Sequence, residues 1–176
     1  MDWVREMIVQ DFSEVRRMRR WRLWVLIVGV AAWGSAGAQT VRCAASQADE
    51  AVVVQTLRTM YAAATVDDMV KLRSVFAPGA YLFDGGIRYD SIDALMGVIH
   101  DYRAKGAAFV WNVTQPDVHV GCNEAWVAFV NDGSVMAPGA AVATPTKWLE
   151  SADLEKRDGV WKIVFFQSTR VPPAAK

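Results

Sequence analysis

The chain has 176 residues, 53 % of them hydrophobic and eight of them Trp, a composition typical of a globular protein and not of a disordered one. From Gln39 onward it carries 13 basic and 15 acidic residues without a basic stripe, which argues against nucleic-acid binding. Two His and two Cys residues, with no CxxC or HxxxH spacing, are too few for an ordinary metal site, so we predict no metal and no cofactor.

Residues 1–38 have the features of a cleaved signal peptide. Basic residues from Arg16 to Arg22 precede an apolar run from Leu23 to Trp33, and the small residues 34–38 end in an A-x-A cleavage pattern. The apolar run is shorter than the roughly 20 residues that cross a bilayer. We therefore predict a periplasmic or secreted protein that begins at Gln39 and has no membrane contact after cleavage.

The start of the chain and its two cysteines give two further expectations. Acidic residues precede Met18 and none follows it within the basic segment, so Met18 is a possible true start. In an oxidising compartment, Cys43 and Cys122 are a candidate disulfide that would add roughly 4 to 5 kcal/mol in the chain-entropy model. Two separate buried thiols are the alternative, and both interpretations stay open.

The first half of the mature chain predicts three helices and a small hairpin. Apolar residues recur at helical spacing over 49–65, again over 69–76 after a cap at residues 66–68, and over 92–105 after a cap at Ser91. Pro78-Gly79 ends the second helix. A strand over 80–84, a Gly85-Gly86 turn and a strand over 87–89 form the hairpin.

The second half predicts four long strands in a meander. Strand-like segments cover 107–120, 124–136, 146–156 and 160–171, and turn residues separate them, including Asp158-Gly159. Residues 39–176 therefore form a single α+β domain. Trp111 is a candidate pocket residue, but Trp111 and Asn112 lie on opposite faces of their strand and the inward one stays undecided.

This order of elements resembles the nuclear-transport-factor-2-like superfamily, which includes SnoaL-like proteins and ketosteroid isomerases. The likeness rests on element order, on the segments Phe76–Asp84 and Asn123–Val127, and on the ending Asp158–Ile163. The resemblance implies a cone in which three N-terminal helices pack on a strongly curved antiparallel sheet and leave a mostly apolar pocket. Members of the superfamily include enzymes, binding domains and assembly domains, so the fold does not give the function.

The resemblance also implies candidate catalytic residues. Tyr61 matches a helical tyrosine that donates to an oxyanion in ketosteroid isomerases, and Asp84 matches the aspartate that moves a proton. The alternatives are a core tyrosine and a turn-capping aspartate. The second acid of those isomerases should fall near Trp148, where no carboxyl group stands, which argues against steroid isomerisation. Glu150 and Asp153 lie on opposite faces of their strand, so they do not form a pair of acids on one face. Both side chains are expected to be exposed to water.

Parity along the last strand gives the remaining expectations. Trp161, Ile163, Phe165 and Gln167 share one face, which the resemblance turns toward the pocket. Val164 and Phe166 then form an outward apolar patch, which favours a homodimer. The alternative is that the C-terminal tail or the segment around Cys43 folds over this face. The leading hypothesis is an exported domain that binds a small apolar molecule. An acid–base isomerase or lyase that uses Asp84 and Tyr61, and a non-catalytic dimeric assembly domain, are the alternatives.

Overall fold

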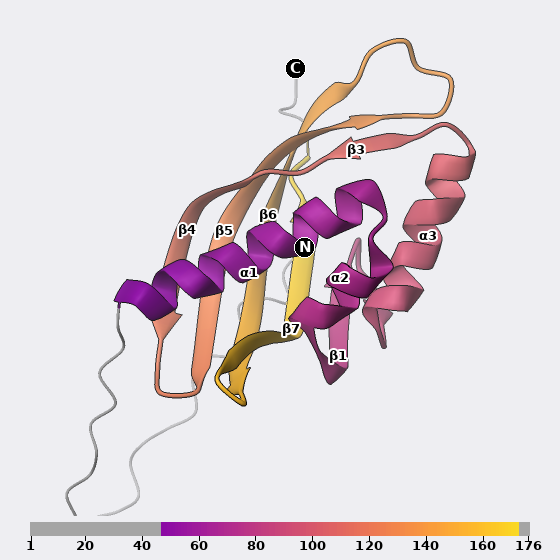
Figure 1. Cartoon of the computed structure of the whole chain (residues 1–176). Helices are drawn as coiled ribbons and strands as arrows, with labels where there is room; N and C mark the ends of the chain where they lie inside the picture. The colour runs from indigo at the N-terminus through magenta and orange to yellow at the C-terminus, as the bar shows by residue number, and fades with distance from the viewer. Residues whose placement is uncertain (1–46, 173–176) are drawn as a thin grey trace, which may run out of the picture. The chain divides into compact units, whose positions relative to one another are not determined.

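The computed structural model describes residues 47–172, and its elements follow the predicted order (Figure 1). The predicted leader and Cys43 lie outside the described residues, so cleavage and the Cys43–Cys122 bridge stay predictions. No helix within residues 47–172 is long and apolar enough to span a membrane. The elements are α1 (Gln47–Val66), α2 (Met69–Val75), β1 (Phe76–Asp84), β2 (Ile87–Tyr89), α3 (Ile92–Ala104), β3 (Ala108–Val110), β4 (Val113–Val120), β5 (Glu124–Met136), β6 (Thr144–Arg157) and β7 (Val160–Arg170).

The strands form one strongly curled mixed sheet in the order β2-β1-β7-β6-β5-β3, with β4 also paired to β5. The predicted α+β class is correct, but the expectation of a purely antiparallel sheet is wrong because β1 runs parallel to β7. Strand β1 also begins at Phe76 and not at Ala80. Phe76 pairs with Ile163, and a shift of register before Tyr81 absorbs Pro78-Gly79 within the strand.

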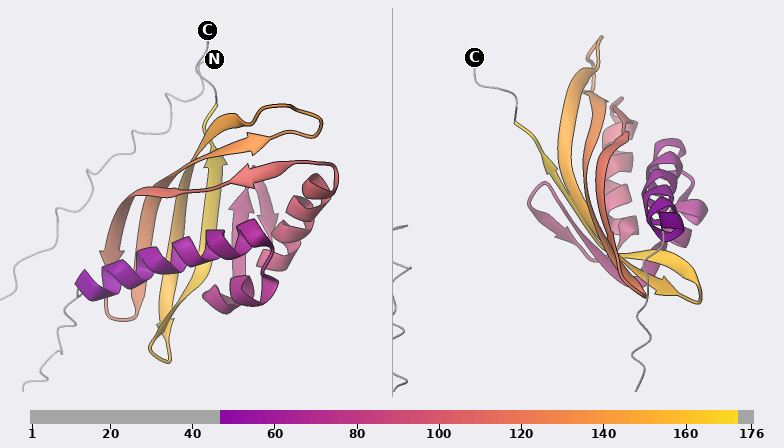
Figure 2. Two further views of the ribbon diagram at one scale, coloured as in Figure 1. Left: turned by 45° about the horizontal axis from the view of Figure 1, so that its top comes forward. Right: turned by 90° about the vertical axis from the view of Figure 1, so that its left-hand side faces the viewer.

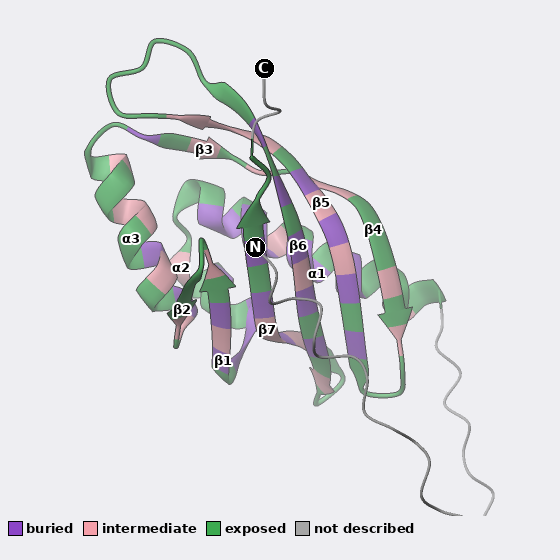
Figure 3. Cartoon of the chain, turned by 180° about the vertical axis from the view of Figure 1, so that it is seen from behind, coloured by how far each residue is buried: buried purple, intermediate pink, exposed green. Residues whose placement is uncertain are grey.

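The three helices lie on one side of the curled sheet (Figure 2). Apolar side chains of α1 and α2 meet the inner faces of β5, β6 and β7 in a single core. Along β6 the buried residues alternate with exposed ones, as expected for a strand with one face on the core (Figure 3). The core includes Val53, Leu57, Leu72, Leu82, Val127, Leu154 and Ile163.

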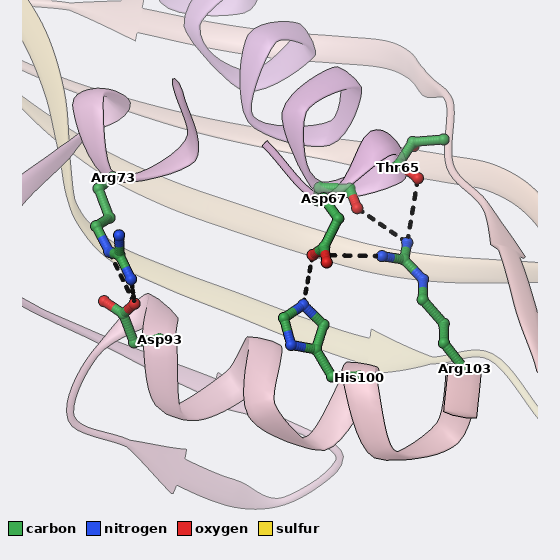
Figure 4. Close-up of polar contacts among 7 residues, drawn as sticks. Thr65, Asp67, Arg73, Asp93, His100 and Arg103 are labelled. Carbon is green, nitrogen blue, oxygen red and sulfur yellow. Dashed lines mark hydrogen bonds and ion pairs between the residues drawn. The ribbon is translucent and has the colours of Figure 1, made fainter. Parts of the chain in front are cut away.

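Polar contacts hold α3 against the turn between α1 and α2. Asp67 at this turn is hydrogen-bonded to His100 and forms an ion pair with Arg103 at 3.8 Å (Figure 4). Arg103 also donates to the Ala64 carbonyl oxygen at 2.9 Å. Arg73 on α2 pairs with Asp93 at the start of α3. His100 thus has a structural role in this arrangement. These contacts hold α1, α2 and α3 together on the inner side of the sheet.

A bulge at Val164 reverses the parity of β7. Leu154 of β6 pairs with Ile163, but the next residue, Asp153, pairs with Phe165, so Val164 is an extra residue in β7. Before the bulge Ile163 is inward, and after it Phe166 is buried at 4 % exposure. A bulge leaves one residue unpaired and so exchanges the two faces of the strand beyond it.

A second irregularity divides the predicted strand 107–120 into β3 and β4. Both segments pair with β5, and the chain between them approaches β5 closely at Gly133. A Cβ atom on Gly133 would lie 1.9 Å from the Val110 carbonyl oxygen. Only glycine fits at this crossing without displacing backbone.

We predict that Gly133→Ala destabilises the protein by roughly 1–3 kcal/mol, because the methyl group must push the β3–β4 connection away from β5. Gly97→Ala is the matched control, since Gly97 is on an exposed part of α3 with nothing within 4 Å of its added Cβ. That control should be neutral or stabilising. Denaturant unfolding measures both, and equal stability of Gly133→Ala and the wild type would contradict the close approach.

Candidate functional site

A cavity of about 120 Å³ lies between the inner face of the sheet and the helices. Its walls are mostly apolar and include four aromatic side chains from the sheet and the β3–β4 connection, namely Phe109, Trp111, Trp148 and Phe166. Its polar lining consists of Tyr61, Asp84, Glu150 and Ser168. The volume is near that of an engineered apolar cavity that admits benzene, so the space suits a small ring or chain.

Three of the polar residues form one row across neighbouring strands. Ser168 of β7 is in register with Asp84 of β1 on one side and with Glu150 of β6 on the other. Residues that are directly opposite on adjacent strands project from the same face of the sheet. The sheet therefore holds two carboxyl groups with a hydroxyl group between them.

Glu150 is the most tightly held group of this row. The Tyr61 hydroxyl of α1 donates to Glu150 Oε2 at 2.5 Å, and the Ser168 hydroxyl donates to Glu150 Oε1 at 2.9 Å. The Glu150 residue is only 6 % exposed. Both carboxylate oxygens thus have a donor, as a buried carboxylate requires.

The break between β3 and β4 completes the site. The Asn112 backbone N–H donates to Asn131 Oδ1 at 2.9 Å, and the Asn112 side chain donates to the Asp132 carbonyl oxygen. These bonds fix the connection so that Trp111 lies beside Tyr61, with 5.6 Å between ring centroids. Asn131 is fully buried, and its Nδ2 has no hydrogen-bond partner among residues 47–172.

Burial dominates the electrostatics of the site. Loss of water raises the pKa of Glu150 from 4.5 to about 7, although hydrogen bonds from Tyr61 and Ser168 act in the opposite direction. Burial likewise raises the pKa of Asp84, while the neighbouring Ser168 hydroxyl group and Gly85 backbone N–H lower it. The pKa of Tyr61 is raised by burial and by the neighbouring Glu150 charge. Glu150 can therefore gain or lose a proton near neutral pH.

The structure brings three of the predicted site residues together: Tyr61, Asp84 and Trp111 all line the cavity. Of Trp111 and Asn112, whose orientation the sequence left undecided, Trp111 is the residue that points into the cavity. Trp161 and Ile163 are inward as expected, but they belong to the packed core and not to the cavity lining.

Three predictions about β7 are wrong because of the bulge at Val164. Phe165 is outward, where it contacts Tyr81 and Phe83, and Gln167 is exposed. Phe166, predicted outside, is buried and lines the cavity. Val164 remains on the outer side with Trp126 and Asp153.

Glu150, Ser168 and Trp148 are site residues that sequence reasoning missed, and the expectation of a solvated Glu150 is wrong. A signal for Glu150 was present in its strand. Glu150 has the same parity as Trp148, Ala152 and Leu154, which places a carboxyl group in the middle of an apolar face. Ser168 gave no such signal, because its parity depends on the bulge. Within the described part of the chain, no cluster of His, Cys, Asp and Glu suits a metal ion.

The chain belongs to the SnoaL-like domain family, whose model matches residues 53–172, and thus to the nuclear-transport-factor-2-like superfamily. No curated protein matches the chain.

Solved structures share the fold at low sequence identity. The chain is similar to a ketosteroid isomerase-like protein from Erwinia carotovora atroseptica, with a TM-score of 0.60, 17 % identity, and coverage of 73 % of this chain and 100 % of that one. It is similar to a putative dehydratase of the NTF2-like family from Streptomyces avermitilis, with a TM-score of 0.58, 14 % identity, and 72 % and 98 % coverage. The association domain of CaMKII from C. elegans gives a TM-score of 0.56, 19 % identity, and 69 % and 95 % coverage.

The raised pKa of Glu150 predicts a stability that falls as pH rises. The folded protein keeps the Glu150 proton up to about pH 7 and the unfolded chain loses it near pH 4.5, so the native state binds more protons in this window. The free energy of unfolding should decline by about 3 kcal/mol between these pH values because of Glu150.

Denaturant unfolding of the wild type and Glu150→Gln at several pH values measures this contribution as the difference between the two slopes. Glu155→Gln is the control, since Glu155 is exposed on the same strand. Parallel pH dependence of the wild type and Glu150→Gln would show that Glu150 titrates as it does in water.

Proposed function

We propose that the protein binds a small, mostly apolar molecule in the cavity and moves a proton on it, as an isomerase or lyase does. The observation that carries this proposal is a pair of carboxyl groups, Glu150 and Asp84, in one apolar cavity. General acid–base catalysis requires groups that change protonation near the working pH, and burial gives Glu150 this property.

The two carboxyl groups suit different roles. Asp84 lies at the end of β1, is partly exposed and has the Gly85 backbone N–H as a neighbour that lowers its pKa, so it is the base. Glu150 is the more buried group and keeps its proton to higher pH, so it is the acid. This pairing of unlike environments is the usual way in which two carboxyl groups divide acid and base work.

Tyr61 acts through Glu150 in this proposal. Its single hydroxyl proton is donated to Glu150 Oε2, so it is not available to a ligand oxygen in this arrangement. This differs from the role that the resemblance to ketosteroid isomerases implied. The oxygen atom of a small ligand would contact Glu150 and Asp84, and the rest of the ligand would contact the aromatic side chains of the cavity.

A second candidate function is assembly as a homodimer through the outer face of the sheet. Tyr81, Phe83 and Phe165 form an aromatic cluster there, with ring centroids 5.1–5.9 Å apart. Leu149 on the same side is 58 % exposed. An apolar patch of this kind is typical of an association site. The contact that we propose therefore uses this cluster and Val164, and not Phe166.

We also propose export, on the strength of the leader pattern in residues 1–38. Mass spectrometry of protein expressed with its leader should give a chain that starts at Gln39. A full-length chain in the membrane fraction would contradict cleavage.

If Cys43 and Cys122 are bridged, alkylation without reductant should leave both unlabelled. Two reactive thiols would contradict the bridge.

The acid–base proposal predicts catalysed hydrogen exchange on a small carbonyl compound. With cyclohexanone in D₂O, the protein should accelerate deuterium entry next to the carbonyl group, as followed by NMR. Asp84→Asn should lower this rate by about 100-fold or more, because it removes the base. The matched control is Asp90→Asn, an exposed residue paired with Arg88. Binding of the ketone without hydrogen exchange would support a binding protein and not an enzyme. The absence of both binding and exchange would contradict the proposal.

The dimer proposal predicts that light scattering gives about twice the chain mass. Phe165→Glu should yield a monomer, because it places a charge in the aromatic cluster. Val70→Glu introduces the same charge on a 79 % exposed position of α2 and should leave the dimer intact. A wild type that is monomeric at high micromolar concentration would overturn the dimer.

A further inference from the structure

The Ser168 hydroxyl lies between two carboxyl groups but has only one proton. It donates that proton to Glu150 Oε1 at 2.9 Å, and it lies beside Asp84, its neighbour in register on β1, whose pKa the hydroxyl group lowers. A hydroxyl group can donate to one acceptor and accept from another donor at the same time. Ser168 can therefore donate to one carboxylate and, at the same time, accept a hydrogen bond from the other carboxyl group when that group is protonated.

The surroundings favour a single proton on this row. No basic side chain of residues 47–172 lines the cavity, so two carboxylates there would lack a compensating positive charge. The remaining titratable neighbours are phenols, with Tyr61 from α1 at Glu150 and Tyr89 of β2 near Asp84. Asn131 from β5 is neutral. Like charges in a shared site resist joint ionisation, so one carboxyl group keeps its proton.

We propose that Ser168 relays a proton between Asp84 and Glu150, so that the two carboxyl groups and the hydroxyl group work as one unit. The inference rests on the proposed acid–base function and adds to it the residue that links the acid to the base. Ser168 is a positioning residue in this scheme, because it acts through the two carboxyl groups.

The relay restores the starting state after an elimination. Asp84 takes a proton from carbon, and Glu150 gives its proton to the leaving oxygen, which departs as water or an alcohol. This leaves Asp84 protonated and Glu150 ionised. Asp84 then donates its proton to the Ser168 oxygen while Ser168 passes its own proton to Glu150, so both groups recover their first state with no net proton gained or lost. A substrate whose hydroxyl group is on the carbon next to an acidic C–H bond fits this sequence, because a carbon–carbon double bond then forms between the two carbons.

Carboxyl carbon-13 NMR of the free protein tests the relay. When Glu150 gains its proton near pH 7, Ser168 should turn its hydrogen bond to Asp84, so the Asp84 carboxyl signal should show a step at the Glu150 midpoint. Ser168→Ala should lose this step, and Ser168→Thr should keep it because the hydroxyl group remains. Ser151→Ala, on the outer face of β6, is the matched control and should keep it.

A full step at Asp84 in Ser168→Ala would overturn the relay, since the charge of Glu150 alone would then account for it. The absence of the step from the wild type would do the same. The titration needs no substrate, so its outcome is separate from that of the proposed function. A step that depends on Ser168, together with no hydrogen exchange on any carbonyl compound, would uphold the coupled row and contradict the enzyme.

Discussion

A buried carboxyl group between two hydroxyl donors is the interaction on which the site depends. Glu150 lies on the inner face of a curled sheet, and removal from water is costly for its charged form. Tyr61 and Ser168 offset part of this cost by donating to its two oxygens. The remaining cost appears as a pKa raised to about 7, which makes Glu150 sensitive to pH in the range where proteins work.

Backbone irregularities put the partners of Glu150 in place. The bulge at Val164 turns Ser168 inward and places it in register between Glu150 and Asp84. The break between β3 and β4 directs Trp111 to Tyr61, and the close approach at Gly133 permits it. Bulges often lie next to functional sites because they re-aim side chains. Here one bulge and one strand break serve the same cavity, which supports a functional interpretation of the row.

Sequence patterns predicted the elements well, because the signals are local. Asp68 and Ser91 cap their helices as expected, and the alternation along β6 and the turn at Asp158-Gly159 define the strands. The parallel pairing of β1 with β7 was missed because it joins segments about 85 residues apart and has no local signal. The bulge at Val164 was missed because it contains no glycine to mark it. That single residue accounts for the wrong faces assigned to Phe165, Phe166 and Gln167.

Glu150 is expected to be a carboxylic acid that releases its proton near neutral pH. The most direct measurement is the carbon-13 chemical shift of the Glu150 side-chain carboxyl carbon as a function of pH, assigned by comparison with Glu150→Gln. A midpoint near pH 7 is the predicted result. A midpoint at the ordinary value of about 4.5 would rule out this role, because Glu150 would then be ionised throughout the working range and could not serve as the acid.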